Sequence, residues 1–254
     1  MLGRGIAIAG CALLAAAAPA AASQGSDAVT RGDHLGYYAD PGETNQLTID
    51  PTAVGLHLSD QGAVIKWLTI PTFGNCEGGL HDVFCVDGGG GFAIYGSLGD
   101  GNDTYVDNVG INADGFDLGS GNNVARVVDT GPDQPYVSFT AGTGADDISG
   151  GGSNWDQFTY ANSPGPVTVT ADDIANDGMA GEGDNIRSTI DIVEGSAFDD
   201  HISGYLSAFG GAGNDVIDIR DGRTGDASCG AGDDTVVADA QDTVQPDCEN
   251  VTIG

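Results

Sequence analysis

Residues 210–218, Gly210-Gly211-Ala212-Gly213-Asn214-Asp215-Val216-Ile217-Asp218, form the unit from which the fold can be predicted. Three of the first four residues are glycine, which adopts the positive φ angles that a tight turn needs. Asp215 places a carboxylate at the end of this turn. Residues 216–218 then predict a short strand in which Ile217 points to the opposite face from its neighbours, because side chains alternate along an extended chain. One nine-residue unit therefore encodes a turn, an acidic side chain, a strand and a core position.

The same arrangement recurs along the chain, with an Asp or Asn followed two residues later by an inward-pointing residue. Successive members are separated by 20, 23, 10, 44, 15 and 19 residues. Two nonapeptides make 18 residues, so most steps are close to one complete coil, and the 44-residue step predicts an insertion. The fold class that we predict is all-β, a right-handed parallel β-solenoid in which each coil buries its apolar residues against the next. The copies are Asp103 with Tyr105, Asn123 with Ala125, Asp146 with Ile148, Asp156 with Phe158, Asp200 with Ile202, Asp215 with Ile217 and Asp234 with Val236.

The first 22 residues predict a secretory signal peptide. A single charge, Arg4, precedes an apolar run, and small residues follow up to Ala22. This composition is typical of an exported protein. The sequence before Cys11 resembles a lipoprotein cleavage box, but its apolar stretch is short and continues beyond Cys11, so simple export is favoured. No later stretch approaches the roughly 18 uninterrupted apolar residues of a membrane-spanning helix, and we expect a secreted chain without a membrane span.

Three regions are expected after the signal peptide. Residues 23–36 predict a flexible leader, residues 37–95 the lead-in strands of the solenoid, and residues 96–254 the repeats. Helix signals are nearly absent, because the 43 glycines and scattered β-branched residues break any sustained period of 3.6. The lead-in strands are expected at Leu47–Asp50, Val54–Leu58, Ala63–Leu68, Val83–Val86 and Phe92–Tyr95.

Four cysteines remain once the signal peptide is removed. They form two pairs that are local in sequence, Cys76 with Cys85 and Cys229 with Cys248. Four cysteines permit three pairings, and an oxidising export compartment together with short loop closure favours the local one. A metal site built from all four thiolates is the alternative, but the chain has no C-x-x-C pair among them.

The charge of the chain excludes some partners. It holds 7 basic and 38 acidic residues, for a formal net charge of −31, and Lys66 is the sole lysine. Binding to nucleic acid therefore has almost no electrostatic basis. The acids do not form runs, as in a disordered acidic tail, but are interleaved with glycine and β-branched residues at recurring spacing. This pattern favours a cation as partner.

Residues 210–218 and 230–238 resemble the RTX, or haemolysin-type, calcium-binding repeats of secreted bacterial proteins, with fainter matches at 99–106 and 142–149. Residues 168–186 resemble a segment that recurs between such repeats. The resemblance implies Ca²⁺ ions between stacked turns, held by glycine-turn carbonyls and by the aspartate at the sixth position. Carried onto this sequence, it implies calcium ligands at Asp103, Asp146, Asp156, Asp200, Asp215 and Asp234, with turn residues Gly99, Gly101, Gly142, Gly144, Gly211, Gly213, Gly230 and Gly232.

Elementary chemistry supports this interpretation but leaves an alternative open. Calcium takes six to eight oxygens at about 2.3–2.6 Å, which carbonyls and carboxylates from two turns can supply. Asn123 lacks the charge, so its site should be weaker or empty. However, Gly-Asp and Gly-Asn pairs also form turns without any metal, as in a calcium-independent structural solenoid. The acidic segment 173–184 imitates part of an EF-hand loop but fails at Ala175; an ordinary solvated loop is favoured there, and an additional calcium site involving Asp184 stays open.

Signatures of catalysis are missing from the sequence. It holds no G-x-S-x-G, H-E-x-x-H, Walker or G-x-G-x-x-G pattern, and its four histidines are scattered. We therefore expect a secreted, non-catalytic calcium-binding protein with a structural or surface-interaction role, whose partners beyond calcium ions include cell-surface or matrix components. The best catalytic alternative is a β-helix enzyme acting on polysaccharides.

Overall fold

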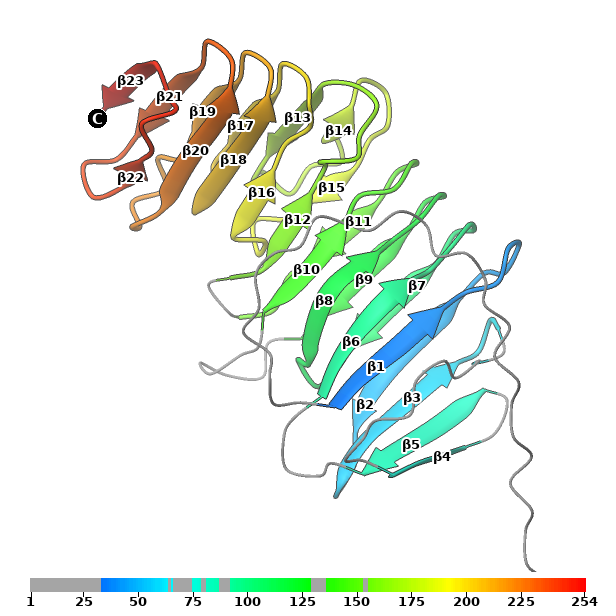
Figure 1. The fold of residues 1–254 in the computed structure, drawn as a ribbon. Helices are drawn as coiled ribbons and strands as arrows, with labels where there is room; N and C mark the ends of the chain where they lie inside the picture. The colour runs from blue at the N-terminus through cyan, green and yellow to red at the C-terminus, as the bar shows by residue number, and fades with distance from the viewer. Residues whose placement is uncertain are drawn as a thin grey trace, which may run out of the picture. The chain divides into compact units, whose positions relative to one another are not determined.

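The computed structural model describes residues 33–63, 65, 75–78, 81–86, 92–128, 136–152 and 155–254, and all regular structure within them is β (Figure 1). The expected all-β class is confirmed. The described residues contain no helix, and so none that could cross a membrane. The strands form three sheets, of nine, eight and six strands.

The nine-stranded sheet is parallel throughout. Its order is β1 (Asp33–Tyr38), β6 (Phe92–Ser97), β8 (Asn112–Asp117), β10 (Val137–Thr140), β12 (Gln157–Thr159), β16 (Ile192–Glu194), β18 (Ser207–Ala212), β20 (Asp226–Ala231) and β22 (Thr243–Val244).

The remaining strands form the other two sheets. The eight-stranded sheet has the order β15 (Asn185–Ile186), β11 (Asp147–Ser149), β9 (Val124–Val127), β7 (Thr104–Asp107), β2 (Gln46–Pro51), β3 (Gly55–Asp60), β5 (Asp82–Val86) and β4 (Asn75–Gly78). The six-stranded sheet has the order β14 (Gly178–Met179), β13 (Val167–Thr170), β17 (His201–Ser203), β19 (Val216–Asp218), β21 (Thr235–Ala238) and β23 (Asn250–Ile253).

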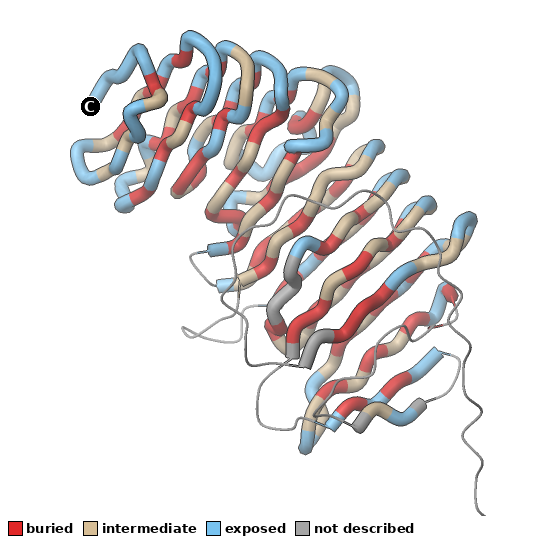
Figure 2. The backbone as a smooth tube through the Cα atoms, viewed as in Figure 1, coloured by how far each residue is buried: buried red, intermediate tan, exposed pale blue. Residues whose placement is uncertain are grey.

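Successive strands from β6 to β13, and again from β16 to β23, lie alternately in the nine-stranded sheet and in one of the other two sheets. Parallel pairing aligns equivalent residues of successive units, as Ile202, Ile217 and Val236 show. All three are fully buried, and the alternation of buried and exposed residues along each strand is visible in Figure 2. The apolar position predicted two residues after each acid therefore does build the core.

The N-terminal end differs from the repeats because its strands are antiparallel. Strands β2, β3, β5 and β4 pair in that order, and a disulfide joins Cys76 to Cys85 across β4 and β5. The predicted leader over 23–36 is too long, since β1 begins at Asp33; residues 23–32 lie outside the described part. Of the strand expected at 63–68, only Ala63 and Ile65 are described, and neither is in a strand.

The predicted insertion is present between β13 and β16. Its strand β14 pairs antiparallel with β13, and its strand β15 pairs parallel with β11. A bridge between Asp177 and Asp184 joins the starts of these two short strands. The insertion thus adds one strand beside β11 and one beside β13, and neither has a counterpart in the nine-stranded sheet, where β12 alone separates β10 from β16.

Candidate functional site

Polar side chains stack in two rows where the chain enters the eight-stranded and six-stranded sheets. Each member is the residue directly before a strand. All are buried except Glu249, which is exposed. The N-terminal row is Asn45, Asp103, Asn123, Asp146 and Asp184; the C-terminal row is Asp200, Asp215, Asp234 and Glu249.

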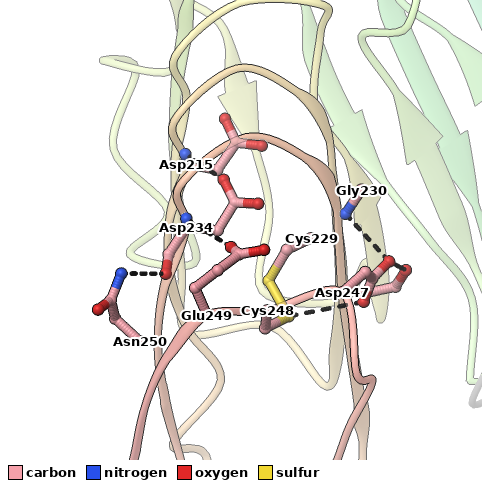
Figure 3. The surroundings of a disulfide bond; sticks show 9 residues. Asp215, Cys229, Gly230, Asp234, Asp247, Cys248, Glu249 and Asn250 are labelled. Carbon is pink, nitrogen blue, oxygen red and sulfur yellow. Dashed lines mark hydrogen bonds between the residues drawn. A yellow bond between two sulfur atoms is a disulfide. The ribbon is translucent and has the colours of Figure 1, made fainter.

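One hydrogen bond repeats along both rows. The backbone N–H of each member donates to a side-chain oxygen of the next member. In the C-terminal row the N–H of Asp200 donates to Asp215 at 2.8 Å. The N–H of Asp215 donates to Asp234 at 2.7 Å and that of Asp234 to Glu249 at 3.0 Å (Figure 3). In the N-terminal row the distances, from Asn45 to Asp184, are 2.6, 2.9, 2.8 and 2.8 Å. The rows therefore tie neighbouring repeats together.

In four of the row aspartates the second carboxylate oxygen accepts no hydrogen bond from a described residue. Among the described residues, no hydrogen-bond donor reaches the buried Oδ2 of Asp103, Asp146, Asp215 or Asp234. Asn123 has an amide nitrogen at the equivalent position, and this Nδ2 donates to the carbonyl oxygen of Gly121 at 3.3 Å. An aspartate places an acceptor where asparagine places a donor. Two facing acceptors need a proton, a water or a cation between them.

Burial alone does not leave a carboxylate unmatched in this protein. Asp107 is fully buried, yet its two oxygens accept the N–H groups of Val109, Gly110 and Ile111. Within the rows, Asp200 is also fully matched, since both of its oxygens accept hydrogen bonds from Ser196. The unmatched oxygens are thus a property of particular turns.

Glycines bring successive turns into close contact. A Cβ on Gly119 would lie 1.8 Å from the carbonyl oxygen of Gly99, and one on Gly232 would lie 1.6 Å from that of Gly213. These positions admit only glycine, and they leave backbone oxygens facing the neighbouring turn. The eight predicted turn glycines all lie within the four residues before a row carboxylate, namely Gly99, Gly101, Gly142, Gly144, Gly211, Gly213, Gly230 and Gly232.

Burial makes several carboxylates of the rows difficult to keep charged. Burial raises the pKa of Asp146 to about 7, and the charges of Asp184 and Glu182 add to the effect. Burial also raises the pKa of Asp215 to about 6, with the charges of Asp200 and Asp234 adding to it. Burial raises the pKa of Asp103 and that of Asp200 as well.

No protein cation compensates these charges within the described residues. The four arginines of that part form ion pairs with aspartates outside the rows. The pairs are Arg126 and Arg187 with Asp147, Arg220 with Asp218, and Arg223 with Asp191 and Asp221.

Five of the six predicted ligands lie in the rows, and one does not. Asp156 precedes β12, a strand of the nine-stranded sheet, so it lies at the opposite edge of the repeat. Its Oδ1 accepts the N–H of Val137 at 3.1 Å, and its own N–H donates to Asp191 at 3.3 Å. The expectation that Asp156 continues the series is therefore wrong. Its 10-residue step is half a repeat, which reverses the edge.

Of the other row members, Asn45 and Glu249 were not predicted as ligands, and a calcium site involving Asp184 was left open. Asn45 follows a turn without the Gly-x-Gly pattern, Asp184 belongs to the insertion, and Glu249 carries a longer side chain. Their shared signal is a polar residue directly before a strand. This signal is weak in sequence, because the partner that defines each row lies between 15 and 58 residues away.

The donor set fits a hard cation. The described residues contain no group of three or more His, Cys, Asp or Glu side chains arranged to hold a metal ion. The rows instead offer carboxylate oxygens, one to a turn, together with the turns' backbone carbonyls. Calcium prefers such oxygen ligands, whereas zinc requires a cluster of thiolate, imidazole or carboxylate side chains.

No known protein family, curated protein or solved structure matches the chain. The functional conclusion therefore depends on the geometry of the rows.

Proposed function

We propose that the chain is a secreted, non-catalytic calcium-binding protein whose RTX-like β-solenoid is folded and stabilised by calcium. One observation carries the proposal. The buried Oδ2 atoms of Asp103, Asp146, Asp215 and Asp234 meet no described donor, and these four residues are predicted calcium ligands. The rows lie at the turns, where RTX-like repeats would hold the ion.

The strand order supports the solenoid. Successive strands alternate between the nine-stranded sheet and a second sheet, and the parallel pairs join strands one unit apart. Such a path winds as a coil. Right-handed winding follows from the strong preference for right-handed crossovers between parallel strands.

In this proposal four of the row carboxylates have two roles. The Oδ1 atoms of Asp103, Asp146, Asp215 and Asp234 hold the N–H groups of the preceding repeat, and their unmatched Oδ2 atoms, together with turn carbonyls, contact the ion. Calcium would supply the positive charge that the described side chains do not provide. Glycine-rich chain loses much conformational entropy on ordering, so binding is coupled to folding. Extracellular calcium modules bind at about 10⁻⁴–10⁻³ M, which favours folding after export.

Secretion and a surface role agree with the chemistry of the chain. Disulfides join Cys76 to Cys85 and Cys229 to Cys248, as is typical of an oxidising compartment. An acidic surface whose described arginines are all paired favours neither nucleic acid nor other polyanions. A structural role, or binding to cell-surface or matrix components, suits this surface better.

The repeated hydrogen bond favours a second candidate function, a calcium-independent structural solenoid. Each row carboxylate already accepts a backbone N–H and so joins repeats without an ion. Protonation of the buried carboxyls, rather than calcium, would then resolve the clash between acceptors.

Thermal unfolding of the secreted chain with both disulfides intact distinguishes the two functions. Circular dichroism is recorded in calcium, in magnesium and in EDTA. We expect a calcium-selective gain of β signal and of melting temperature. At a free concentration ~100 times the dissociation constant, each independent site adds about 2.7 kcal/mol to the free energy of unfolding. Equal melting temperatures in calcium and EDTA would favour the calcium-independent solenoid.

A further inference from the structure

An acidic and aromatic row crosses the antiparallel end of the eight-stranded sheet. Asp50 on β2 lies opposite His57 on β3, His57 lies opposite Phe84 on β5, and Phe84 lies opposite Glu77 on β4. The four residues therefore follow one line across four strands. Their neighbours along the strands point into the core, as the fully buried Val83 shows. The row thus lies on the outer face of the sheet.

Two aromatic rings form the centre of this row. The rings of His57 and Phe84 stack with centroids 4.3 Å apart and planes inclined by 8°. Nε2 of His57 lies 3.0 Å from Oδ1 of Asp82, which fixes the imidazole. Phe84 is 52% exposed, so a large part of its ring faces outward. Glu77, on the other side of Phe84 from His57, is also exposed.

The stacked rings and carboxylates of this acidic and aromatic row suit the binding of a planar cation. Asp50, Asp82 and Glu77 flank the stacked rings with hydrogen-bond acceptors and negative charge. A guanidinium binds an aromatic face by cation–π attraction and a carboxylate by paired hydrogen bonds. Arg126, the described arginine in the same sheet, is paired with Asp147. We propose that Phe84 and Glu77 bind an arginine side chain of a basic partner protein, with Asp82 and Asp50 adding to the attraction.

A basic protein segment fits this row better than a sugar does. Glycan sites combine an aromatic platform with both donors and acceptors, whereas the exposed polar side chains beside the rings, Asp82 and Glu77, are carboxylates, which only accept. The formal net charge of −31 also attracts a cationic partner over a longer range. This binding surface is separate from the carboxylate rows and does not depend on the ions proposed there.

Isothermal titration calorimetry tests the proposal on the full secreted chain in saturating calcium. The probe is a capped peptide of Gly-Arg repeats, compared with Gly-Lys and Gly-citrulline repeats. We expect the arginine peptide to bind most tightly and Phe84→Leu to weaken it about 2- to 5-fold, the range of an exposed cation–π contact. Phe84→Trp should retain the affinity for the arginine peptide. Glu77→Gln should also weaken binding of this peptide.

Phe209→Leu is the matched control, since Phe209 is a partly exposed aromatic residue on the nine-stranded sheet and its replacement changes no charge. It should bind the peptide as the unmodified chain does. Equal affinities for the Phe84→Leu and Phe209→Leu chains would overturn the proposal, because diffuse attraction by the acidic surface would then explain binding. Binding of cellohexaose that depends on Phe84, without selectivity for the arginine peptide, would also overturn it in favour of a glycan site.

Discussion

The two carboxylate rows share one hydrogen bond but differ in charge. The first four members of the N-terminal row alternate between amide and acid, beginning Asn45, Asp103 and Asn123. The C-terminal row is acidic at every member, with Asp215 and Asp234 in successive repeats. An amide completes its turn with its own N–H group, as the contact of Asn123 with Gly121 shows.

The difference in charge between the rows also determines which acids raise the pKa of a row member. The acids that raise the pKa of Asp103 are Asp60 and Asp100, outside its row, whereas those that raise the pKa of Asp215 include its row neighbours Asp200 and Asp234. Repulsion between row neighbours therefore runs along the C-terminal row, whereas in the N-terminal row it is confined to the last two members, Asp146 and Asp184. We expect the dependence on calcium to be concentrated in the C-terminal row.

Removal of calcium should have the largest effect and should divide the molecule. In EDTA, hydrogen exchange should quicken first in the backbone amides of residues 195–254 and later in those of residues 92–128. Several sites contribute, each worth about 2.7 kcal/mol at ~100 times its dissociation constant. Exchange measured by mass spectrometry with and without calcium checks this. Uniform protection changes along the chain would contradict the difference between the rows.

Loss of the Cys229–Cys248 disulfide should have the next largest effect. This bond joins β20 to the segment before β23, beside the end of the C-terminal row (Figure 3). The Cys229→Ser/Cys248→Ser chain should lose about 3 kcal/mol of stability through loop entropy, and it should also bind calcium more weakly. Calorimetric calcium titration and chemical unfolding measure the two effects.

The Cys76→Ser/Cys85→Ser chain is the matched control. It should lose a similar but slightly smaller amount of stability, because its loop spans 9 residues and not 19. Its calcium affinity should stay unchanged, since the bond lies at the antiparallel end. An equal loss of calcium affinity in both variants would show that the C-terminal row has no special share of the sites.

The repeating unit could be predicted from the sequence because its signals are local. Glycine spacing predicted the turns, and the apolar residue two places after each acid predicted buried positions such as Ile217. The hydrogen bonds of the rows could not be predicted, since they depend on register between residues such as Asn45 and Asp103, 58 positions apart. The short 10-residue step before Asp156 was the signal in the sequence that set this residue apart from the rows.

Exchanging amide and acid between the rows should change both stability and calcium binding. Asp215→Asn should raise stability in EDTA by about 1–3 kcal/mol, the usual cost of an unsatisfied buried polar group, and should weaken calcium binding. Asn123→Asp should lower stability in EDTA by a similar amount, and calcium should restore part of it. Melting curves of both variants in calcium and in EDTA provide the test. Equal changes in the two media would mean that no ion contacts these positions.

The pH dependence of the calcium-free chain tests the charge of individual row members. Burial raises the pKa of Asp215 to about 6 and that of Asp146 to about 7 in the folded chain, above the ordinary value of 3.8. Between pH 3.8 and 7 the folded state therefore binds more protons than the unfolded chain, and the free energy of unfolding falls as pH rises through this window.

Calcium should flatten or reverse this dependence, because it favours the charged carboxylates. Melting temperatures in EDTA should fall on going from acid to neutral pH. Asp215→Asn should remove the part of the fall that is complete by about pH 6, and Asp146→Asn the part that extends to about pH 7. A calcium-free chain that gains stability across this window would show that the row carboxylates are charged without an ion, and that the mismatch at Oδ2 is resolved by water.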